Sequence, residues 1–250
     1  MVSRKGKFMI SYNNTAKEVK ESGVDMAILP FGSVEQHSSH LPIGTDVMLA
    51  EDIARGIAER INALLLPAIP ISTCYEHKGT KGSVCMRPIT FYQMLQDIVL
   101  CLRDQGIKKV AVVLGHGGIF IAAPAIRELN ALYDDLQVVL VQSGSGKGNR
   151  RSLLENTEPE IHAGESETSL MLYLHEELVN KELMMQNDYT PEYPQNMLNH
   201  VPLTRISGTG AWGKSSLATK EKGKAIYECI VKNSVEYIER ALSVCPKEKW

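Results

Sequence analysis

The chain has 250 residues, of which 44% are hydrophobic and 22% charged, and a formal net charge of −2, as in ordinary globular proteins. This balance argues against a nucleic-acid partner or an anionic membrane partner, because both require a marked excess of basic residues. Five cysteines without CxxC spacing indicate neither a zinc knuckle nor a disulfide framework, and no apolar targeting or membrane segment is evident, so we expect one cytoplasmic domain spanning residues 1–250.

Near the N-terminus, the sequence predicts a short helix followed by a buried strand. Thr15, with Glu18 three positions later, fits a capping box and favours a helix over residues 14–23. The apolar run of residues 26–31 is typical of a strand that is covered on both faces. Apolar residues then recur at helical spacing over residues 46–61, so strand, loop and helix form a βα unit.

The loop between this strand and this helix carries Glu35, His37, His40 and Asp46. Ligands bind at the carboxyl ends of strands in open α/β sheets, so the cluster lies where chemistry is expected. Glu35 and His37 are two positions apart, and an extended backbone points both side chains to one side. Carboxylate and imidazole groups without thiolate suit Zn, Mn or Fe(II). The alternative is a polar loop in which Asp46 only caps the helix and the histidines are solvated.

Further elements alternate between strand and helix along the chain. The pattern predicts strands over residues 63–71, which Pro67 and Pro70 break, 110–114 and 136–141. It predicts helices over residues 91–103, with Thr90 as the cap, and 122–133. The strand at 110–114 ends in Gly-His-Gly-Gly, so His116 also lies at a strand exit. About six strands alternating with helices indicate an α/β fold with a mainly parallel sheet and helices on both faces.

The segment of residues 161–178 begins with polar residues and continues as a helix with one apolar face. Its start carries His162, Glu165 and Glu167. A functional role is one interpretation of the two glutamates. The other is that the helix dipole alone favours acidic residues in a first turn, and both interpretations are open at this point.

Two loop-rich segments flank this helix. Residues 143–151 are rich in glycine and serine but lack the GxxxxGK[ST] spacing, so we interpret them as a surface loop rather than a phosphate cradle. Residues 187–214 form a long loop region, which we interpret as a lid or a subunit contact. A final helix is predicted over residues 217–244.

Several blocks of this sequence resemble the signature blocks of the creatininase (creatinine amidohydrolase) family. The first block reads E-Q-H-x-x-H-L-P-x-G-T-D from Glu35 to Asp46. The others are G-H-G-G at 115–118, H-A-G-x-x-E-T-S at 162–169, and W-G with A-T-x-E-K-G at 212–213 and 218–223. The resemblance implies a three-layer αβα fold, two divalent metal ions (Zn, Mn or Fe) as cofactors, and a homo-oligomer, commonly a hexamer.

The resemblance also implies which side chains hold the metal ions. By position in these blocks, the ligands are Glu35, His37, Asp46 and His116, with Asp46 as the bridge. Family members that act on creatinine carry a Glu two residues after the histidine matching His116, where this chain has Gly118. We therefore assign the remaining ligand to Glu167, in the E-T-S block. Glu35, Asp46, Glu167 and one bridging hydroxide would balance the four positive charges of two divalent ions.

Other residues are expected to act around this centre. We expect His162 to be the proton shuttle to the leaving nitrogen, because histidine carries protons in both directions near neutral pH. We expect Glu167 to be a catalytic residue together with His162, in addition to being a metal ligand. The residues expected to orient ligands or contact substrate are His40, His77, Trp212 and Glu165.

The predicted activity is hydrolysis of a small-molecule substrate. Two divalent ions activate a hydroxide and polarise a carbonyl, so we expect cleavage of a cyclic amide or formamide-like C–N bond in a small polar metabolite. Ile161, Leu114 and Ile119 replace polar residues of the creatinine-hydrolysing members, so creatinine is not the expected substrate. The alternatives are a hydrolase that opens a cyclic diketone at a C–C bond in inositol-type sugar catabolism, the deformylase and peptidase reactions of other relatives, and a metal-free small-molecule sensor on the same fold.

Overall fold

The protein is built on a parallel sheet that carries the candidate site at one edge. The structure is a computed structural model in which residues 9–142, 145 and 150–244 are described. Within these residues, five parallel strands follow the order β1-β3-β2-β4-β5. They are β1 (Ile10–Ser11), β2 (Met26–Phe31), β3 (Leu64–Leu65), β4 (Lys109–Leu114) and β5 (Gln137–Val141). Phe31 pairs with Leu114, so β2 and β4 end side by side and the loops that follow them start from neighbouring points.

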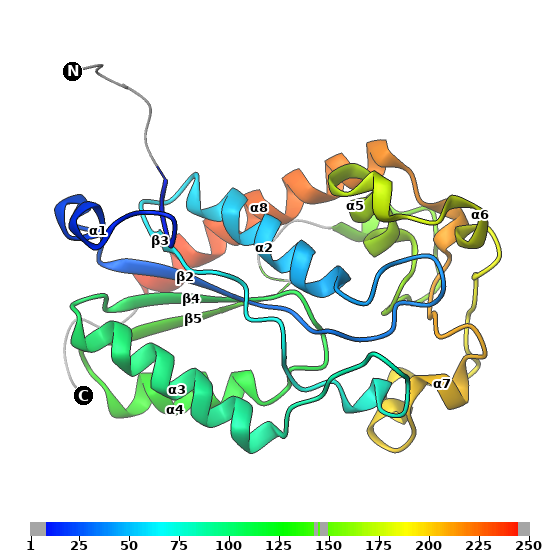
Figure 1. The fold of residues 1–250 in the computed structure, drawn as a ribbon, viewed down its shortest axis with the longest axis horizontal. Coiled ribbons are helices and arrows are strands. Elements are labelled where there is room, and N and C mark those ends of the chain that lie inside the picture. The colour runs from blue at the N-terminus through cyan, green and yellow to red at the C-terminus, as the bar shows by residue number, and fades with distance from the viewer. Residues whose placement is uncertain (1–8, 143–144, 146–149, 245–250) are drawn as a thin grey trace.

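Helices cover both faces of this sheet (Figure 1). One face packs against α2 (Thr45–Ala58), α5 (Glu165–Leu174) and α8 (Lys220–Ser243), and the other against α3 (Pro88–Asp104) and α4 (Ala122–Leu132). Three short helices lie outside these layers: α1 (Ala16–Ser22), α6 (Lys181–Met184) and α7 (Leu203–Ile206). The predicted three-layer αβα fold with a mainly parallel sheet is confirmed.

The position of the central strands between two helical layers explains why their sequences are apolar throughout. In β2, Ala27, Leu29 and Phe31 pack toward α3 and α4, whereas Met26 and Ile28 pack toward α2 and α8. Successive side chains of a strand point to opposite faces, so a strand between two helical layers buries every residue. The sheet therefore has one hydrophobic cluster on each of its faces.

Several predicted boundaries differ from the structure. The expected strand over residues 63–71 is reduced to β3, because Pro67 and Pro70 supply no backbone donor to the ladder. The helix expected to follow Thr90 begins instead at Pro88, a residue favoured in a first helical turn. The helix expected to reach residue 178 ends at Leu174. In contrast, the capping box of Thr15 and Glu18 is present at the start of α1.

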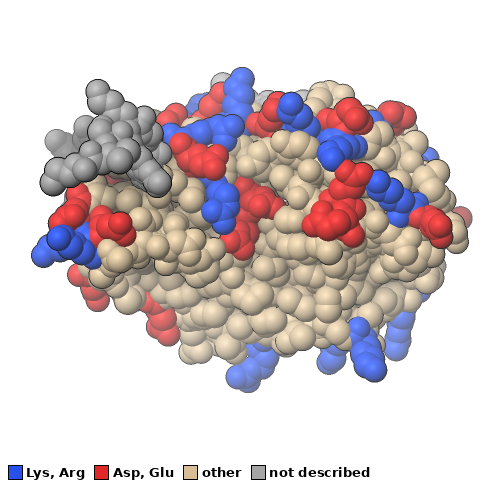
Figure 2. Space-filling model, turned by 45° about the horizontal axis from the view of Figure 1, so that its top comes forward, with Lys and Arg blue, Asp and Glu red and all other residues tan. Residues whose placement is uncertain are grey.

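The surface and the cysteines agree with the composition. Figure 2 shows acidic and basic side chains mixed along the upper part of the visible face, above a broad area with few charged residues, and no large area of one sign. Among the described residues, no helix combines the length and the hydropathy needed to cross a bilayer. Cys74, Cys85, Cys101 and Cys229 are free thiols, and Cys245 lies outside the described residues. So does most of the loop at 143–151, namely residues 143–144 and 146–149.

Candidate metal centre

Two glycines place the first turn of α2 directly against the ends of β2 and β4. A Cβ on Gly32 would lie 2.4 Å from Val47 Cα, and a Cβ on Gly115 would lie 2.4 Å from the Asp46 carbonyl oxygen. Side chains at these positions would force α2 away from the sheet, since heavy atoms do not approach so closely. The two glycines therefore allow the first turn of α2, which carries Asp46, to lie at the point where β2 and β4 end.

Four of the expected ligands meet at this point. Glu35, His37, Asp46 and His116 are all buried, with at most 6% of any residue exposed. His116 Nδ1 lies 3.1 Å from Glu35 Oε1 and 3.2 Å from Asp46 Oδ2. His37 Nε2 lies 3.2 Å from Asp46 Oδ1. The two oxygens of Asp46 thus face two different histidines, as a bridging carboxylate would require.

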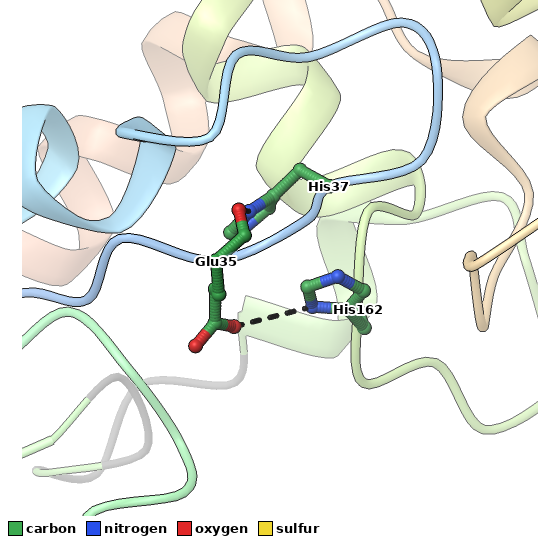
Figure 3. A group of neighbouring side chains, drawn as sticks. All are labelled: Glu35, His37 and His162. Carbon is green, nitrogen blue, oxygen red and sulfur yellow. Dashed lines mark hydrogen bonds and ion pairs between the residues drawn. The ribbon is translucent and has the colours of Figure 1, made fainter. Parts of the chain in front are cut away.

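The ligand atoms form two groups that share Asp46. Glu35, Asp46 and His116 form one group, and His37, Asp46 and Glu167 form the other. In each group, one ligand atom from every residue lies within 4.8 Å of the others. A further group of this kind contains Glu35, His37 and His162, which are drawn in Figure 3. The structure therefore brings together all five of the expected ligands, from segments that are up to 132 positions apart in the sequence (167 − 35).

The carboxylates of this group have the environment of a cation site. Both Glu35 carboxylate oxygens and Asp46 Oδ2 are buried and form no aligned hydrogen bond with any described residue, although histidine nitrogens lie 3.1–3.2 Å from Glu35 Oε1 and Asp46 Oδ2. Buried polar atoms normally have partners, because an unpaired charge in a low-dielectric interior is costly. The oxygen and nitrogen donors suit Zn, Mn or Fe. The residues present therefore fit a divalent metal centre.

Without a metal ion, the imidazoles balance the carboxylates. Burial raises the pKa of Glu35, but the adjacent His116 and His77 outweigh this effect and hold that pKa well below its ordinary value. Burial lowers the pKa of His37, but the Asp46 carboxylate outweighs it and raises the pKa to about 10. Protonated imidazoles thus supply the positive charge that the carboxylates need, and cations can replace these protons.

Glu167 is held in place at the start of α5. The backbone N–H of Ala163 donates to Glu167 Oε2 at 2.6 Å. Ala163 has a left-handed backbone conformation (φ 48°), an uncommon state for a residue with a side chain that tends to occur at functional sites. Burial, reinforced by the Asp46 and Glu35 carboxylates, raises the pKa of Glu167 to about 7. A third carboxylate beside two others is the arrangement that a bound cation would stabilise.

His162 faces the ligands from the segment before α5. Its Nε2 lies 2.7 Å from the Gln36 carbonyl oxygen, which can only accept, and 3.2 Å from the Gln36 side-chain amide nitrogen, so the shorter contact favours the tautomer with the proton on Nε2. The unprotonated Nδ1 lies 3.8 Å from Glu35 Oε1, as the dashed line in Figure 3 shows. Burial and the neighbouring His37 hold the pKa of His162 well below its ordinary value. The ring can therefore offer Nδ1 to a proton or to a cation.

His77 and His40 surround the centre from different sides. His77 Nε2 lies 3.1 Å from Glu35 Oε1, and the Gln36 side-chain amide lies 2.9 Å from His77 Nδ1. His40 instead contacts Thr168 Oγ1 at 3.0 Å and the Asn187 side-chain amide at 3.2 Å. His77 therefore contacts the carboxylate of an expected ligand, whereas His40 joins the loop that carries the expected ligands to α5.

We expect His40 to make stability depend on pH. Burial, and then the positive charge of His37, lower its pKa from 6.5 to about 4. Between these pH values the unfolded chain binds a proton at His40 that the folded chain does not, so the free energy of unfolding should rise with pH from 4 to 6.5. The total change is at most about 3 kcal/mol. Urea unfolding of the chelator-treated protein should show a flatter pH profile for His40→Gln, whereas the profile should not change for the exposed His200→Gln.

Trp212 and Glu165 lie outside the group of ligands. Trp212 is buried, and its backbone pairs with that of His162 through hydrogen bonds of 2.8 and 3.2 Å, so it positions the histidine. The Glu165 carboxylate accepts from the backbone N–H groups of Glu155 and Asn156 and from Lys222 Nζ. These contacts give the Glu165 carboxylate structural partners that are not among the expected ligands.

A cavity of about 980 Å³ leads to this centre. Its lining includes His116, His162 and Glu167. It also includes the exposed aromatic residues Tyr75 and Phe120, together with Asn196, Leu198 and Leu203 from the region of residues 187–214. The expected ligands therefore meet at a site that a substrate can reach.

One site residue received no role from the sequence. Glu76 lies in the short helix of residues Tyr75–His77, and its Oε1 lies 3.1 Å from His116 Nε2. Glu76 directly precedes His77, which the sequence places near the expected ligands. This adjacency is the signal that could have pointed to Glu76. No spacing in the sequence relates Glu76 to His116, forty positions later.

Comparison with known proteins identifies the family. The family model for creatininase, described as creatinine amidohydrolase, matches residues 12–238. The chain belongs to the creatininase family. Its members are metal-dependent amidohydrolases, which agrees with the buried carboxylate and histidine groups at the strand ends.

Individual relatives carry different names within this family. A creatinine amidohydrolase of Pseudomonas putida is 28% identical over 236 residues, which cover 87% of this chain and 90% of the relative. A mycofactocin precursor peptide peptidase of Mycobacterium ulcerans (strain Agy99) is 26% identical, covering 85% and 84%. A 3-dehydro-scyllo-inosose hydrolase of Thermotoga maritima is 24% identical, covering 90% and 80%. The family is thus shared by relatives named for different substrates.

Solved structures support the same assignment. A crystal structure of creatinine amidohydrolase (creatininase) superposes with a TM-score of 0.80 at 28% identity, covering 94% of this chain and 98% of that one. A structure of creatininase with Mn also has a TM-score of 0.80, at 26% identity, covering 93% of this chain and 98% of that one. The creatininase-family fold therefore extends over nearly the whole chain.

Proposed function

We propose that this chain is a binuclear metal-dependent hydrolase of a C–N bond in an amide. The observation that carries the proposal is the pair of ligand groups, Glu35–Asp46–His116 and His37–Asp46–Glu167, which share one carboxylate. Asp46 would bridge two divalent ions of Zn, Mn or Fe, and Glu35, His37, His116 and Glu167 would hold them. We propose that residues 1–250 act as one hydrolase domain, since the family match spans most of them.

The residues around the centre have distinct tasks in this proposal. When bound, two divalent ions lower the pKa of water and polarise a carbonyl oxygen. His162 would accept a proton at Nδ1 and deliver it to the leaving nitrogen, because its Nε2 is already committed to the Gln36 carbonyl. His77 would keep the Glu35 carboxylate aimed at the centre, and His40 would hold the ligand loop against α5. The surrounding burial would exclude bulk water from the proton transfer.

The substrate proposal is a cyclic amide or formamide-like bond in a small polar metabolite. The cavity of about 980 Å³ leaves room for a substrate larger than one ring, so peptide-like amides belong in the same test. The relative named 3-dehydro-scyllo-inosose hydrolase supports a second candidate, the opening of a cyclic diketone at a C–C bond. The same centre would serve both reactions, because each uses an activated hydroxide. We also propose a cytoplasmic homo-oligomer without nucleic-acid or membrane partners.

Metal content and a substrate panel test this function together. Elemental analysis after purification without chelator should give about two equivalents of Zn, Mn or Fe per chain, as a binuclear site requires. The metal-loaded protein should then hydrolyse a member of a panel of lactams, formamides, short peptides and cyclic diketones, and chelation should abolish the activity. A protein that stays metal-free after reconstitution but binds a small molecule would instead favour the sensor alternative.

A further inference from the structure

We propose that Glu76 is a positioning residue that fixes His116 as a metal ligand. The inference rests on the proposed metal centre and names a residue that supports it. His116 offers Nδ1 to the Glu35 and Asp46 oxygens, at 3.1 and 3.2 Å. Its other ring nitrogen, Nε2, therefore points away from the ligand group. A histidine that binds a metal through one nitrogen needs an acceptor for the proton on the other.

Glu76 is the carboxylate at that second nitrogen. Glu76 Oε1 lies 3.1 Å from His116 Nε2, and only 16% of the Glu76 side chain is exposed. His116 Nε2 itself is buried and forms no aligned hydrogen bond with any described residue. A small turn of the carboxylate would supply the acceptor that this nitrogen lacks. The negative charge would also raise the basicity of the ring and strengthen its bond to a cation.

The glycine at position 118 makes room for this carboxylate. A Cβ built on Gly118 would lie 1.7 Å from Glu76 Oε1 and 2.4 Å from His116 Nε2. Any side chain at this position would thus occupy the place of the Glu76 carboxylate. The Gly-His-Gly-Gly turn therefore both presents His116 and leaves open the space through which a separate loop delivers its partner.

The competing role for Glu76 is direct contact with the substrate, since the residue also lines the cavity. The two roles predict different measurements. A substrate contact would change KM or kcat and leave metal binding unchanged. A positioning residue would weaken the binding of one metal ion before any substrate is added, by about 10- to 100-fold.

The experiment is a titration of chelator-treated protein with Mn²⁺ in competition with a chromophoric chelator. The wild type should bind two equivalents. Glu76→Ala should bind one ion with unchanged affinity and the other about 10- to 100-fold more weakly. Glu76→Gln should recover most of this loss, because its amide oxygen can still accept from Nε2–H. The exposed Glu177→Gln should match the wild type, and thermal unfolding of the metal-free proteins would verify that each variant is folded.

The outcomes separate the inference from the function on which it rests. A wild type that binds no metal contradicts the proposed function. A wild type that binds two ions, with a folded Glu76→Ala of equal affinity, overturns the positioning role. If Glu76→Gln binds the metal ion as weakly as Glu76→Ala, the role of Glu76 as a hydrogen-bond acceptor is overturned. If Glu76→Ala does not fold, Glu76→Asp replaces it, because this change withdraws the carboxylate from His116 but keeps the charge, and unchanged affinity would again overturn the inference.

Discussion

Asp46→Ala should remove both metal ions and nearly all hydrolytic activity. Asp46 belongs to both ligand groups, and each of its oxygens faces a different histidine at 3.2 Å. Its loss would leave each ion with two of the three ligands in its group and would also remove one of the negative charges that the ions neutralise. We expect a protein that retains neither ion after gel filtration, with activity reduced by about 10³-fold or more.

His116→Ala supplies the comparison for Asp46→Ala. This histidine belongs to one ligand group only, so its loss should remove about one equivalent of metal. The exposed Asp97→Ala on α3 removes the same side chain away from the site and should keep both ions. Equal metal loss in Asp46→Ala and His116→Ala would contradict a bridging role for Asp46, and retention of both ions in Asp46→Ala would contradict the site.

Gly115→Ala should destabilise the protein by about 2–3 kcal/mol and also weaken metal binding. The added Cβ would lie 2.4 Å from the Asp46 carbonyl oxygen and 2.8 Å from Ala50 Cβ. Because the nearest atom belongs to the backbone of α2, no side-chain rotation relieves the contact and the helix must move. Urea unfolding would measure the change in the free energy of unfolding, and chelator competition would measure the change in metal affinity.

Gly117→Ala is the matched control for Gly115→Ala, in the same turn and two positions away. Nothing lies within 4 Å of a Cβ on Gly117, so we expect a change within about 0.5 kcal/mol. If both substitutions cost the same, the effect would come from the backbone freedom of glycine rather than from the approach of α2. In that case the close contact would not explain how Asp46 reaches the site.

The sequence was most informative where burial and position at a strand end coincide. The apolar run of β2 and the polar residues after it predicted both the strand and the location of Glu35, His37 and Asp46, because a strand buried on both faces has few alternatives. Pro67 and Pro70, which the sequence already marks as breaks in the strand over residues 63–71, shorten it to β3 and leave only an isolated bridge at Ile69. The family resemblance, rather than spacing, distinguished Glu167 from Glu165, and the structure gives their carboxylates separate partners.

Contacts between distant loops could not be predicted in this way. The distance between Glu76 and His116 depends on how the segment after β3 folds over the end of β4, and no local pattern encodes it. The same holds for His162, whose orientation depends on a carbonyl of the loop after β2. Sequence patterns indicate which element a residue belongs to, whereas the path of an irregular loop depends on the packing of the whole domain.

The wide separation of the ligands along the chain has a consequence for how the enzyme matures. Glu35, Asp46, His116 and Glu167 become neighbours only after β2, β4, α2 and α5 have docked. No short segment holds either ligand group in full. We therefore expect the chain to reach its native topology first, with protonated imidazoles among the carboxylates, and to exchange those protons for cations afterwards. Newly synthesised protein should thus accumulate as a folded precursor whose activation depends on the supply of metal in the cell.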